Sequence, residues 1–137
     1  MEELIELVKN WIKRANNDIK TAKDELNTET PATDTICFHA QQCVEKYLKA
    51  YLVFHQKYFK KIHNISKLIE LCKETDPDFE KLSFFGADKL TSYAIEIRYA
   101  DEESYFPSVD EAKEAINIAE KVKEFILGNL KQKGFKE

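Results

Sequence analysis

The sequence predicts an all-α fold, an up-and-down bundle of four main helices with one additional short helix. Apolar residues recur at steps of three and four along most of the chain, which is the spacing of one face of an α-helix. Only three glycines and three prolines occur among 137 residues, too few for the turns of a β-sandwich or barrel. A chain of this length with 43% hydrophobic residues is expected to form a single domain, residues 1–137, around its own core.

The first two helices are separated by the turn-forming sequence NTETPATD, residues 27–34. One apolar stripe runs along residues 3–26, and a second helix is expected over about 35–59. In that second helix Leu48 and Leu52 fall on a different face from the core stripe, because successive helical residues are about 100° apart. Two apolar faces indicate two neighbours. One is the core of the same chain, and the other is open to a second copy of the protein.

The second half of the chain contains the remaining helices. A short helix is expected after Asn64, and it stops before the sequence TDPD at residues 75–78. A fourth main helix is predicted over 87–98 from the apolar stripe Ala87, Leu90, Ala94 and Ile97. Ser108 and Glu111 then form a capping box that opens the last helix.

Charge and cysteine usage limit the environment and the chemistry. A net charge of −4 excludes the uniformly basic shell of a non-specific nucleic-acid coat protein. The N-terminal sequence is acidic and no apolar run reaches membrane length, so we expect a soluble protein without membrane association. Three cysteines without metal-binding spacing fit a reducing compartment, the cytoplasm. The sequence lacks Glu-x-x-His, phosphate-binding and dinucleotide motifs, and we therefore expect the protein to bind neither a metal nor a cofactor.

Four polar residues of the second helix, His39, Gln42, Lys46 and Lys49, form the first candidate site. Their spacing places them on one stripe beside the core, where an imidazole, an amide and two ammonium groups can meet an anionic ligand. The other interpretation is the solvated flank of an amphipathic helix.

The segment 57–67 is the second candidate site, because it carries lysines and no acidic residue. Tyr58 and Phe59 lie among the lysines, so the rings can stack on a base while the ammonium groups meet phosphates. The structural interpretation is that the lysines compensate the end of the second helix and that His63, beside Asn64, caps the next one.

The third candidate site is the sequence around Arg98, which ends the fourth helix. A guanidinium beside aromatic hydroxyls and carboxylates, here Tyr99, Asp101 and Tyr105, can hold a phosphate. The structural alternative is a local ion pair between Arg98 and the acidic residues that follow it.

Three segments, HAQQCVEKYLKAYL (39–52), HNISKLIELC (63–72) and YAIEIRYADEESY (93–105), together resemble the HEPN family, the nucleotide-binding domain of higher eukaryotes and prokaryotes. The resemblance implies a helical bundle that forms a homodimer. Similar proteins are often encoded beside a small nucleotidyltransferase, as a toxin–antitoxin-like pair. Many members are metal-independent RNases whose motif is an arginine followed, after four to six residues, by a histidine.

Arg98 matches the arginine of that motif, whereas Glu103, Ser104 and Tyr105 stand where the histidine is expected. Without this imidazole, general acid–base catalysis worth about 10²–10⁴ in rate is lost. The resemblance therefore implies a nucleotide- or RNA-binding protein whose site includes Arg98. It also offers Tyr105 or Tyr99 as the target of nucleotide transfer by the partner.

Two other functions stay open from the sequence. One is a metal-independent endoribonuclease that uses His39 or His63 as a displaced base. The other is a dimeric scaffold without a small ligand, joined through Leu48 and Leu52.

Overall fold

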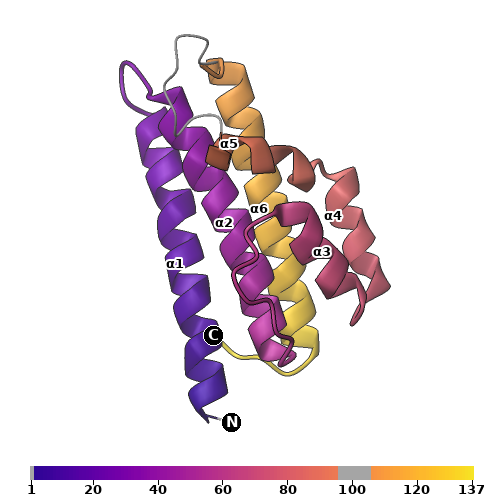
Figure 1. The fold of residues 1–137 in the computed structure, drawn as a ribbon. Helices are drawn as coiled ribbons and strands as arrows, with labels where there is room; N and C mark the ends of the chain where they lie inside the picture. The colour runs from indigo at the N-terminus through magenta and orange to yellow at the C-terminus, as the bar shows by residue number, and fades with distance from the viewer. Residues whose placement is uncertain (1, 96–105) are drawn as a thin grey trace.

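Three long helices form the frame of the molecule: α1 (Glu2–Leu26), α2 (Thr33–Phe54) and α6 (Val109–Gln132). The structure is a computed structural model, and it describes residues 2–95 and 106–137. α1 and α2 form an antiparallel hairpin, and α6 packs against both (Figure 1). The predicted all-α helical class is confirmed. Among the described residues, no helix combines the length and the apolar character needed to cross a membrane.

α2 is the central helix, because other elements cover it on nearly every side. Thirteen of its 22 residues are buried, and it contacts α1, α3, α5 and α6. Leu48 and Leu52 are both 0% exposed, and Cys72 of α3 places its Sγ 4.0 Å from the Leu48 carbonyl oxygen. The expectation that Leu48 and Leu52 face a second copy of the chain is therefore wrong. The second neighbour of α2 is a later part of the same chain.

α2 ends at Phe54, five residues before the predicted end, because the backbone turns into the left-handed region at Gln56 (φ 55°). The Gln56 N–H donates to the Val53 carbonyl at 3.0 Å, and the Lys57 N–H donates to the Leu52 carbonyl at 2.8 Å. These two bonds form a Schellman motif, which satisfies the last carbonyls of the helix. The apolar pattern continues to Phe59, and for this reason it does not reveal the end of the helix.

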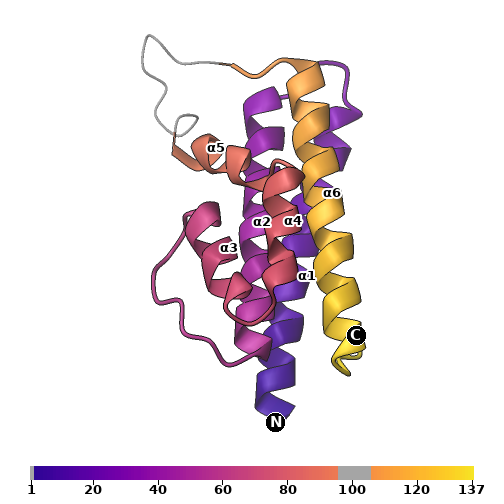
Figure 2. The same cartoon turned by 90° about the vertical axis from the view of Figure 1, so that its right-hand side faces the viewer.

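The segment that follows, residues 55–64, runs back along α2, and α3 (Ile65–Lys73) starts beside the middle of α2 (Figure 2). Asn64 caps α3, and its side chain accepts a hydrogen bond from the Lys67 N–H at 3.1 Å. The predicted start of this short helix after Asn64 is confirmed.

Short pieces follow α3 in place of a long helix. A 3₁₀ turn η1 (Pro77–Phe79) and α4 (Glu80–Phe84) precede the region predicted as the fourth main helix, residues 87–98. Within that region the described residues form a second 3₁₀ turn η2 (Ala87–Leu90) and then α5 (Thr91–Ile95). Gly86, with φ 88°, separates α4 from η2, and a left-handed residue of this kind ends a helix. Ala87 and Leu90 are buried as predicted, but the predicted end near Arg98 lies outside the described residues.

The start of α6 is as predicted. The Ser108 hydroxyl accepts a hydrogen bond from the Glu111 N–H at 3.0 Å, which is one half of a capping box. The carboxylate of Glu111 accepts a hydrogen bond from the Tyr93 hydroxyl at 2.6 Å, and this contact joins α5 to the first turn of α6.

Replacing Leu48 tests whether its face is internal. Leu48→Ala is expected to lower the free energy of unfolding by about 2–5 kcal/mol, because a fully buried side chain is lost from a packed core. Urea denaturation measures this change. Leu7→Ala is the control, since Leu7 is 49% exposed, and it should cost about 0.5 kcal/mol or less. A Leu48→Glu protein that folds normally as a monomer would contradict the internal packing.

Candidate functional site

A buried carboxylate joins α1 to α2 in what we call the Asp18 cluster, made of Asp18, His39 and Lys46. Asp18 of α1 is only 7% exposed. Its Oδ1 lies 2.7 Å from Nδ1 of His39, and its Oδ2 accepts a hydrogen bond from Lys46 Nζ at 2.6 Å. Two members of the predicted polar stripe of α2 therefore do lie together. Their charge is balanced by an acid of the same chain.

A second group, the Glu45 cluster, lies on the side of α2 that the segment 55–64 covers. It consists of Gln41, Glu45, Lys49 and His63. Glu45 Oε2 accepts from Lys49 Nζ at 2.8 Å and lies 2.9 Å from His63 Nδ1. Its other oxygen, Oε1, accepts from Gln41 Nε2 at 3.0 Å. Glu45 and Lys49 are 5% and 4% exposed, so an ion pair one helical turn long is held almost entirely out of water.

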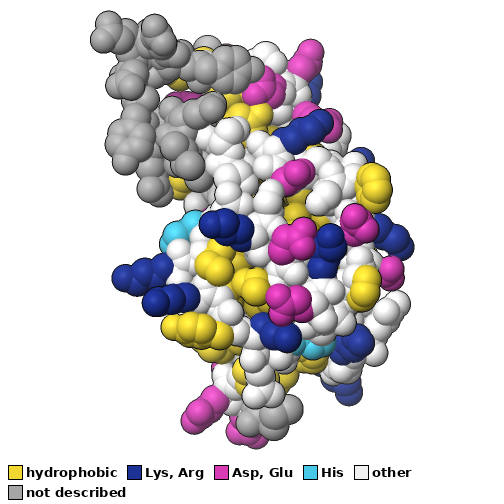
Figure 3. Space-filling model, turned by 45° about the vertical axis from the view of Figure 1, so that its right-hand side comes forward, with side chains coloured by type: hydrophobic (Ala, Val, Ile, Leu, Met, Phe, Trp, Pro, Cys, Tyr) yellow, Lys and Arg dark blue, Asp and Glu magenta, His cyan; other side chains and the backbone are white. Residues whose placement is uncertain are grey.

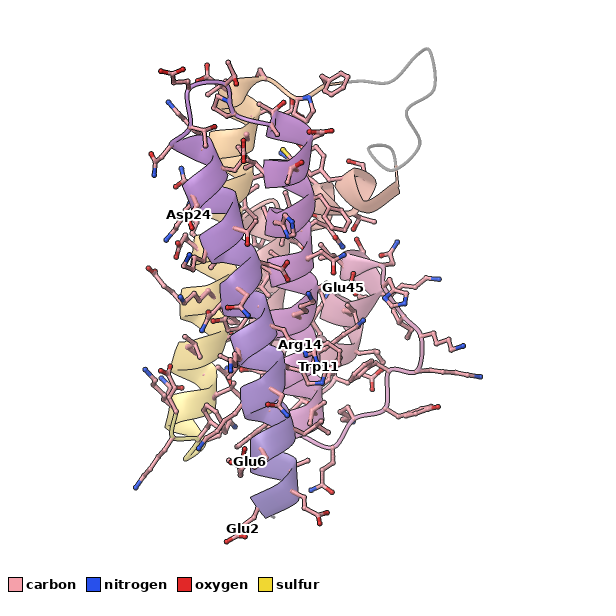
Figure 4. All side chains as sticks on the ribbon, turned by 90° about the vertical axis from the view of Figure 1, so that its left-hand side faces the viewer. Glu2, Glu6, Trp11, Arg14, Asp24 and Glu45 are labelled. Carbon is pink, nitrogen blue, oxygen red and sulfur yellow. The ribbon has the colours of Figure 1, made fainter. Side chains whose placement is uncertain are left out.

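The surroundings of the Glu45 carboxyl explain why this buried group stays ionised. Burial alone would raise the pKa of the Glu45 carboxyl, but hydrogen bonds from Lys49, His63 and Gln41 outweigh it and hold the pKa below its usual range. Lys49 Nζ also lies 5.6 Å from the ring centres of both Trp11 and Phe59, within the range of a cation–π interaction. Figure 4 shows Trp11 of α1 at the edge that faces Glu45 of α2.

His63 is the exposed member of the Glu45 cluster, with 68% of its side chain accessible. Nδ1 lies between Glu45 Oε2 and Lys49 Nζ, which is 3.1 Å away. Nδ1 can donate to the carboxylate in one tautomer or accept from the ammonium group in the other. In the first tautomer Nε2 is the nitrogen that carries the free lone pair. A buried carboxylate that holds an imidazole in one tautomer is an arrangement suited to general-base catalysis.

The other sequence-predicted residues have different positions. Gln42 donates a hydrogen bond to Gln41 Oε1 at 2.9 Å and so extends the Glu45 cluster. The structural role proposed for His63 as a helix cap belongs instead to Asn64. Arg98, Tyr99, Asp101 and Tyr105 lie outside the described residues.

Sequence reasoning missed the acids that organise both clusters. Asp18 and Glu45 were not singled out, although each interrupts or borders an apolar stripe where a charged residue needs a partner. The signal for Glu45 was available locally, since Lys49 follows it at the i,i+4 spacing of a helical ion pair.

The cysteine thiols are buried and chemically quiet. Burial raises the pKa of the Cys37 thiol to about 12 and also holds the pKa values of Cys43 and Cys72 above their usual range. A protonated, buried thiol is a poor nucleophile. Within residues 2–95 and 106–137, no three histidines, cysteines or acids gather as a metal site would require.

Comparison with known proteins identifies the class. The family model for the HEPN domain matches residues 8–130, and the chain therefore belongs to the HEPN family. A solved structure described as an archaeal HEPN homologue, ST0689, superposes with a TM-score of 0.65 at 26% sequence identity, covering 89% of this chain and 96% of its own. A protein of Methanocaldococcus jannaschii named "Putative toxin MJ1304" is 33% identical over 144 residues, which cover 94% of this chain and 91% of that protein.

Breaking the buried ion pair should be far more costly than breaking an exposed one. Glu45→Gln leaves the Lys49 ammonium buried without its counter-ion, and we expect a loss of roughly 3–5 kcal/mol in the free energy of unfolding. The double variant Glu45→Gln with Lys49→Met should recover much of this loss.

The matched control is Lys20 with Asp24, which has the same i,i+4 spacing and the same 2.8 Å distance but lies in solvent. Asp24→Asn should leave stability unchanged. Equal effects of Glu45→Gln and Asp24→Asn in chemical denaturation would contradict a buried, coupled pair.

Stability should also depend on the ionisation of Glu45. Its pKa is lowered in the folded protein, so its contribution is complete above the usual carboxyl value of about 4.3 and is lost as the pH falls below that value. The midpoint temperature of thermal unfolding, measured between pH 7 and pH 3, should therefore fall less steeply at the acid end in Glu45→Gln than in the wild type. Parallel curves for the two proteins would argue against this role.

Proposed function

We propose that this HEPN protein binds the phosphate groups of RNA or nucleotides and acts with a small nucleotidyltransferase in a toxin–antitoxin-like pair. The observation that carries the proposal is the match to a protein named as a toxin, which extends over nearly the full length of both chains. Family membership supports the same class of ligand. We also propose a homodimer, formed through a surface other than the Leu48 and Leu52 face.

Arg98 is the residue we assign to phosphate recognition. It matches the arginine of the family motif, and a guanidinium can hold two phosphate oxygens at once. Tyr99, Asp101 and Tyr105 complete the proposed ligand-binding segment, with Tyr105 or Tyr99 as the acceptor of a nucleotide from the partner. His39, Gln42, Lys46 and His63 are proposed to contribute from the bundle side.

The Glu45–His63 pair favours a second function, metal-independent cleavage of RNA. In this reaction Nε2 of His63 takes the proton of a ribose 2′-hydroxyl, the 2′-oxygen attacks the adjacent phosphorus, and the bond to the 5′-oxygen breaks. The products are a 2′,3′-cyclic phosphate and a 5′-hydroxyl. The leaving 5′-oxygen receives its proton from water, and the His63 imidazolium releases the proton it took to solvent. The supporting observation is that a buried carboxylate 2.9 Å from Nδ1 orients an exposed imidazole.

Arg98→Ala should abolish phosphate-dependent binding of a labelled single-stranded RNA while the thermal unfolding temperature stays unchanged. Arg98→Lys should recover part of the affinity, because it keeps the charge but not the two-pronged geometry. Lys113→Ala removes an exposed charge on α6 and serves as the control. Undiminished binding by Arg98→Ala, measured by fluorescence anisotropy, would reject Arg98 as the recognition residue.

Cleavage of RNA in the presence of EDTA tests the second function. If His63 is the base, His63→Ala should lower the rate about 10²–10⁴-fold, and Glu45→Gln should change the pH profile of the reaction. His39→Ala is the comparison variant, since His39 also contacts a buried acid through Nδ1, and a larger loss in His39→Ala than in His63→Ala would assign the base to His39 instead. Absence of cleavage by the wild type, or equal rates in the wild type and His63→Ala, would exclude His63 as a base.

A further inference from the structure

An open groove of about 640 Å³ lies where the end of α2 meets the first turns of α1. Leu4 and Val53 form its aliphatic floor, and the backbone and side chains of residues 56–61 form its wall. The volume is in the range of small-ligand sites. The groove contains the first part of the second candidate segment, residues 57–67, and apart from His63 the proposed function assigns that segment no role.

The rim of the groove is cationic. Lys57, Lys60 and Lys61 all line it, and none of its lining residues is acidic. Lys57 reaches Glu74 at 3.9 Å, whereas within the described part of the chain Lys60 and Lys61 form no ion pair. Figure 3 shows basic side chains (Lys or Arg) that project beside a histidine and apolar side chains on one face of the molecule. On a chain with net charge −4, this is a local site for an anion.

An exposed aromatic ring stands among these lysines. Tyr58 is 81% exposed and lines the groove. The neighbouring Phe59 is used internally, because its ring packs edge-on against Trp11 with 6.1 Å between ring centres. Phe59 thus anchors the segment to the bundle, and the Tyr58 ring is left available for a planar ligand.

The backbone of the segment is held in a defined shape. Gln56 (φ 55°) and Lys60 (φ 46°), neither of them glycine, adopt the left-handed conformation on either side of Tyr58 and Phe59. This conformation costs about 1–2 kcal/mol per residue. The Schellman bonds at the end of α2 and the Ile62 N–H, which donates to the Phe59 carbonyl at 3.1 Å, stabilise it. A ligand binding here meets a surface that is already ordered.

We propose that this groove binds one nucleotide unit of a single-stranded RNA, with a base stacked on Tyr58 and its phosphates at Lys60 and Lys61. The ligand class rests on the proposed function, whereas the location differs from the Arg98 segment and takes the second candidate segment to a defined groove. Ammonium groups alternating with an exposed ring match the alternation of phosphate and base along a single strand. The bound strand would continue toward His63, which follows Lys61 by two residues.

Binding of a fluorescein-labelled 12-nucleotide oligo(A) RNA, followed by anisotropy, tests this site. Tyr58→Ala should weaken binding about 5- to 150-fold, as expected for loss of one stacked base. Phe84→Ala is the matched control, because Phe84 is 83% exposed on α4, and it should have no effect. Equal affinities of the Tyr58→Ala and Phe84→Ala proteins would overturn the proposal.

Substitutions that remove the charge of Lys60 and Lys61 test whether these lysines contact phosphates. Lys60→Asn, which tolerates the left-handed backbone, combined with Lys61→Gln should reduce the slope of log affinity against log salt by about 1.4, the value for two phosphate contacts on a single strand. Lys113→Gln with Lys136→Gln removes the same charge from exposed positions elsewhere and should leave the slope unchanged. Equal slopes for the two double variants would overturn the role of Lys60 and Lys61.

The same assay separates this site from the proposed function. Loss of binding in Arg98→Ala but not in the Tyr58 and lysine variants would overturn the proposal for the groove and leave the proposed function standing. Loss in the Tyr58 and lysine variants supports the groove whatever Arg98→Ala does. If the wild type binds ATP but no RNA, or binds neither, the strand proposal fails. Because Trp11 is the sole tryptophan and contacts Phe59, a change in its emission on adding RNA should accompany binding at this groove.

Discussion

The structure depends on the burial of α2 on nearly all sides, which requires a partner within the protein for the buried charged groups of that helix. An uncompensated charge in such a position is strongly destabilising. Asp18 of α1 meets this need for Lys46, and Glu45 meets it for Lys49. The same requirement therefore fixes how α1 lies on α2 and where the segment 55–64 crosses it. The candidate site is a by-product of packing a charged helix in the centre of a bundle.

The early end of α2 connects this packing to the surface. If the helix continued to Phe59, the chain would move away from Glu45, and His63 could not return to it. The Schellman motif at Gln56 reverses the chain instead, so that Phe59 reaches Trp11 and Lys49 and His63 reaches Glu45. One left-handed residue thus brings an imidazole, a buried acid, a lysine and two aromatic rings to one edge of the α1–α2 pair.

The sequence was sufficient for the helical class, the family and the starts of α3 and α6, because periodicity and side-chain caps such as Asn64 and Ser108 are local signals. It was insufficient where tertiary contacts decide. Leu48 looked like an external face because a helical projection cannot show which later segment covers it. The left-handed turn at Gln56 could not be predicted, because the residue there is not the glycine that usually marks such a turn. The sequence indicated the candidate site through its cationic side chains. It did not indicate Asp18 and Glu45, because their roles depend on contacts between distant segments.

The central position of α2 also has a consequence during synthesis. Its first partner, α1, precedes it, but α6 is made only after most of the chain has been translated. At a synthesis rate of about 5–20 residues per second, about 4–16 s pass between the synthesis of α2 and the completion of α6. During this time the apolar flank of α2 that carries Tyr47 and Tyr51 is only partly covered. A nascent chain in this state is exposed to aggregation and to chaperones. The completed α1–α2 hairpin is therefore a stage of synthesis at which the chain exposes apolar surface.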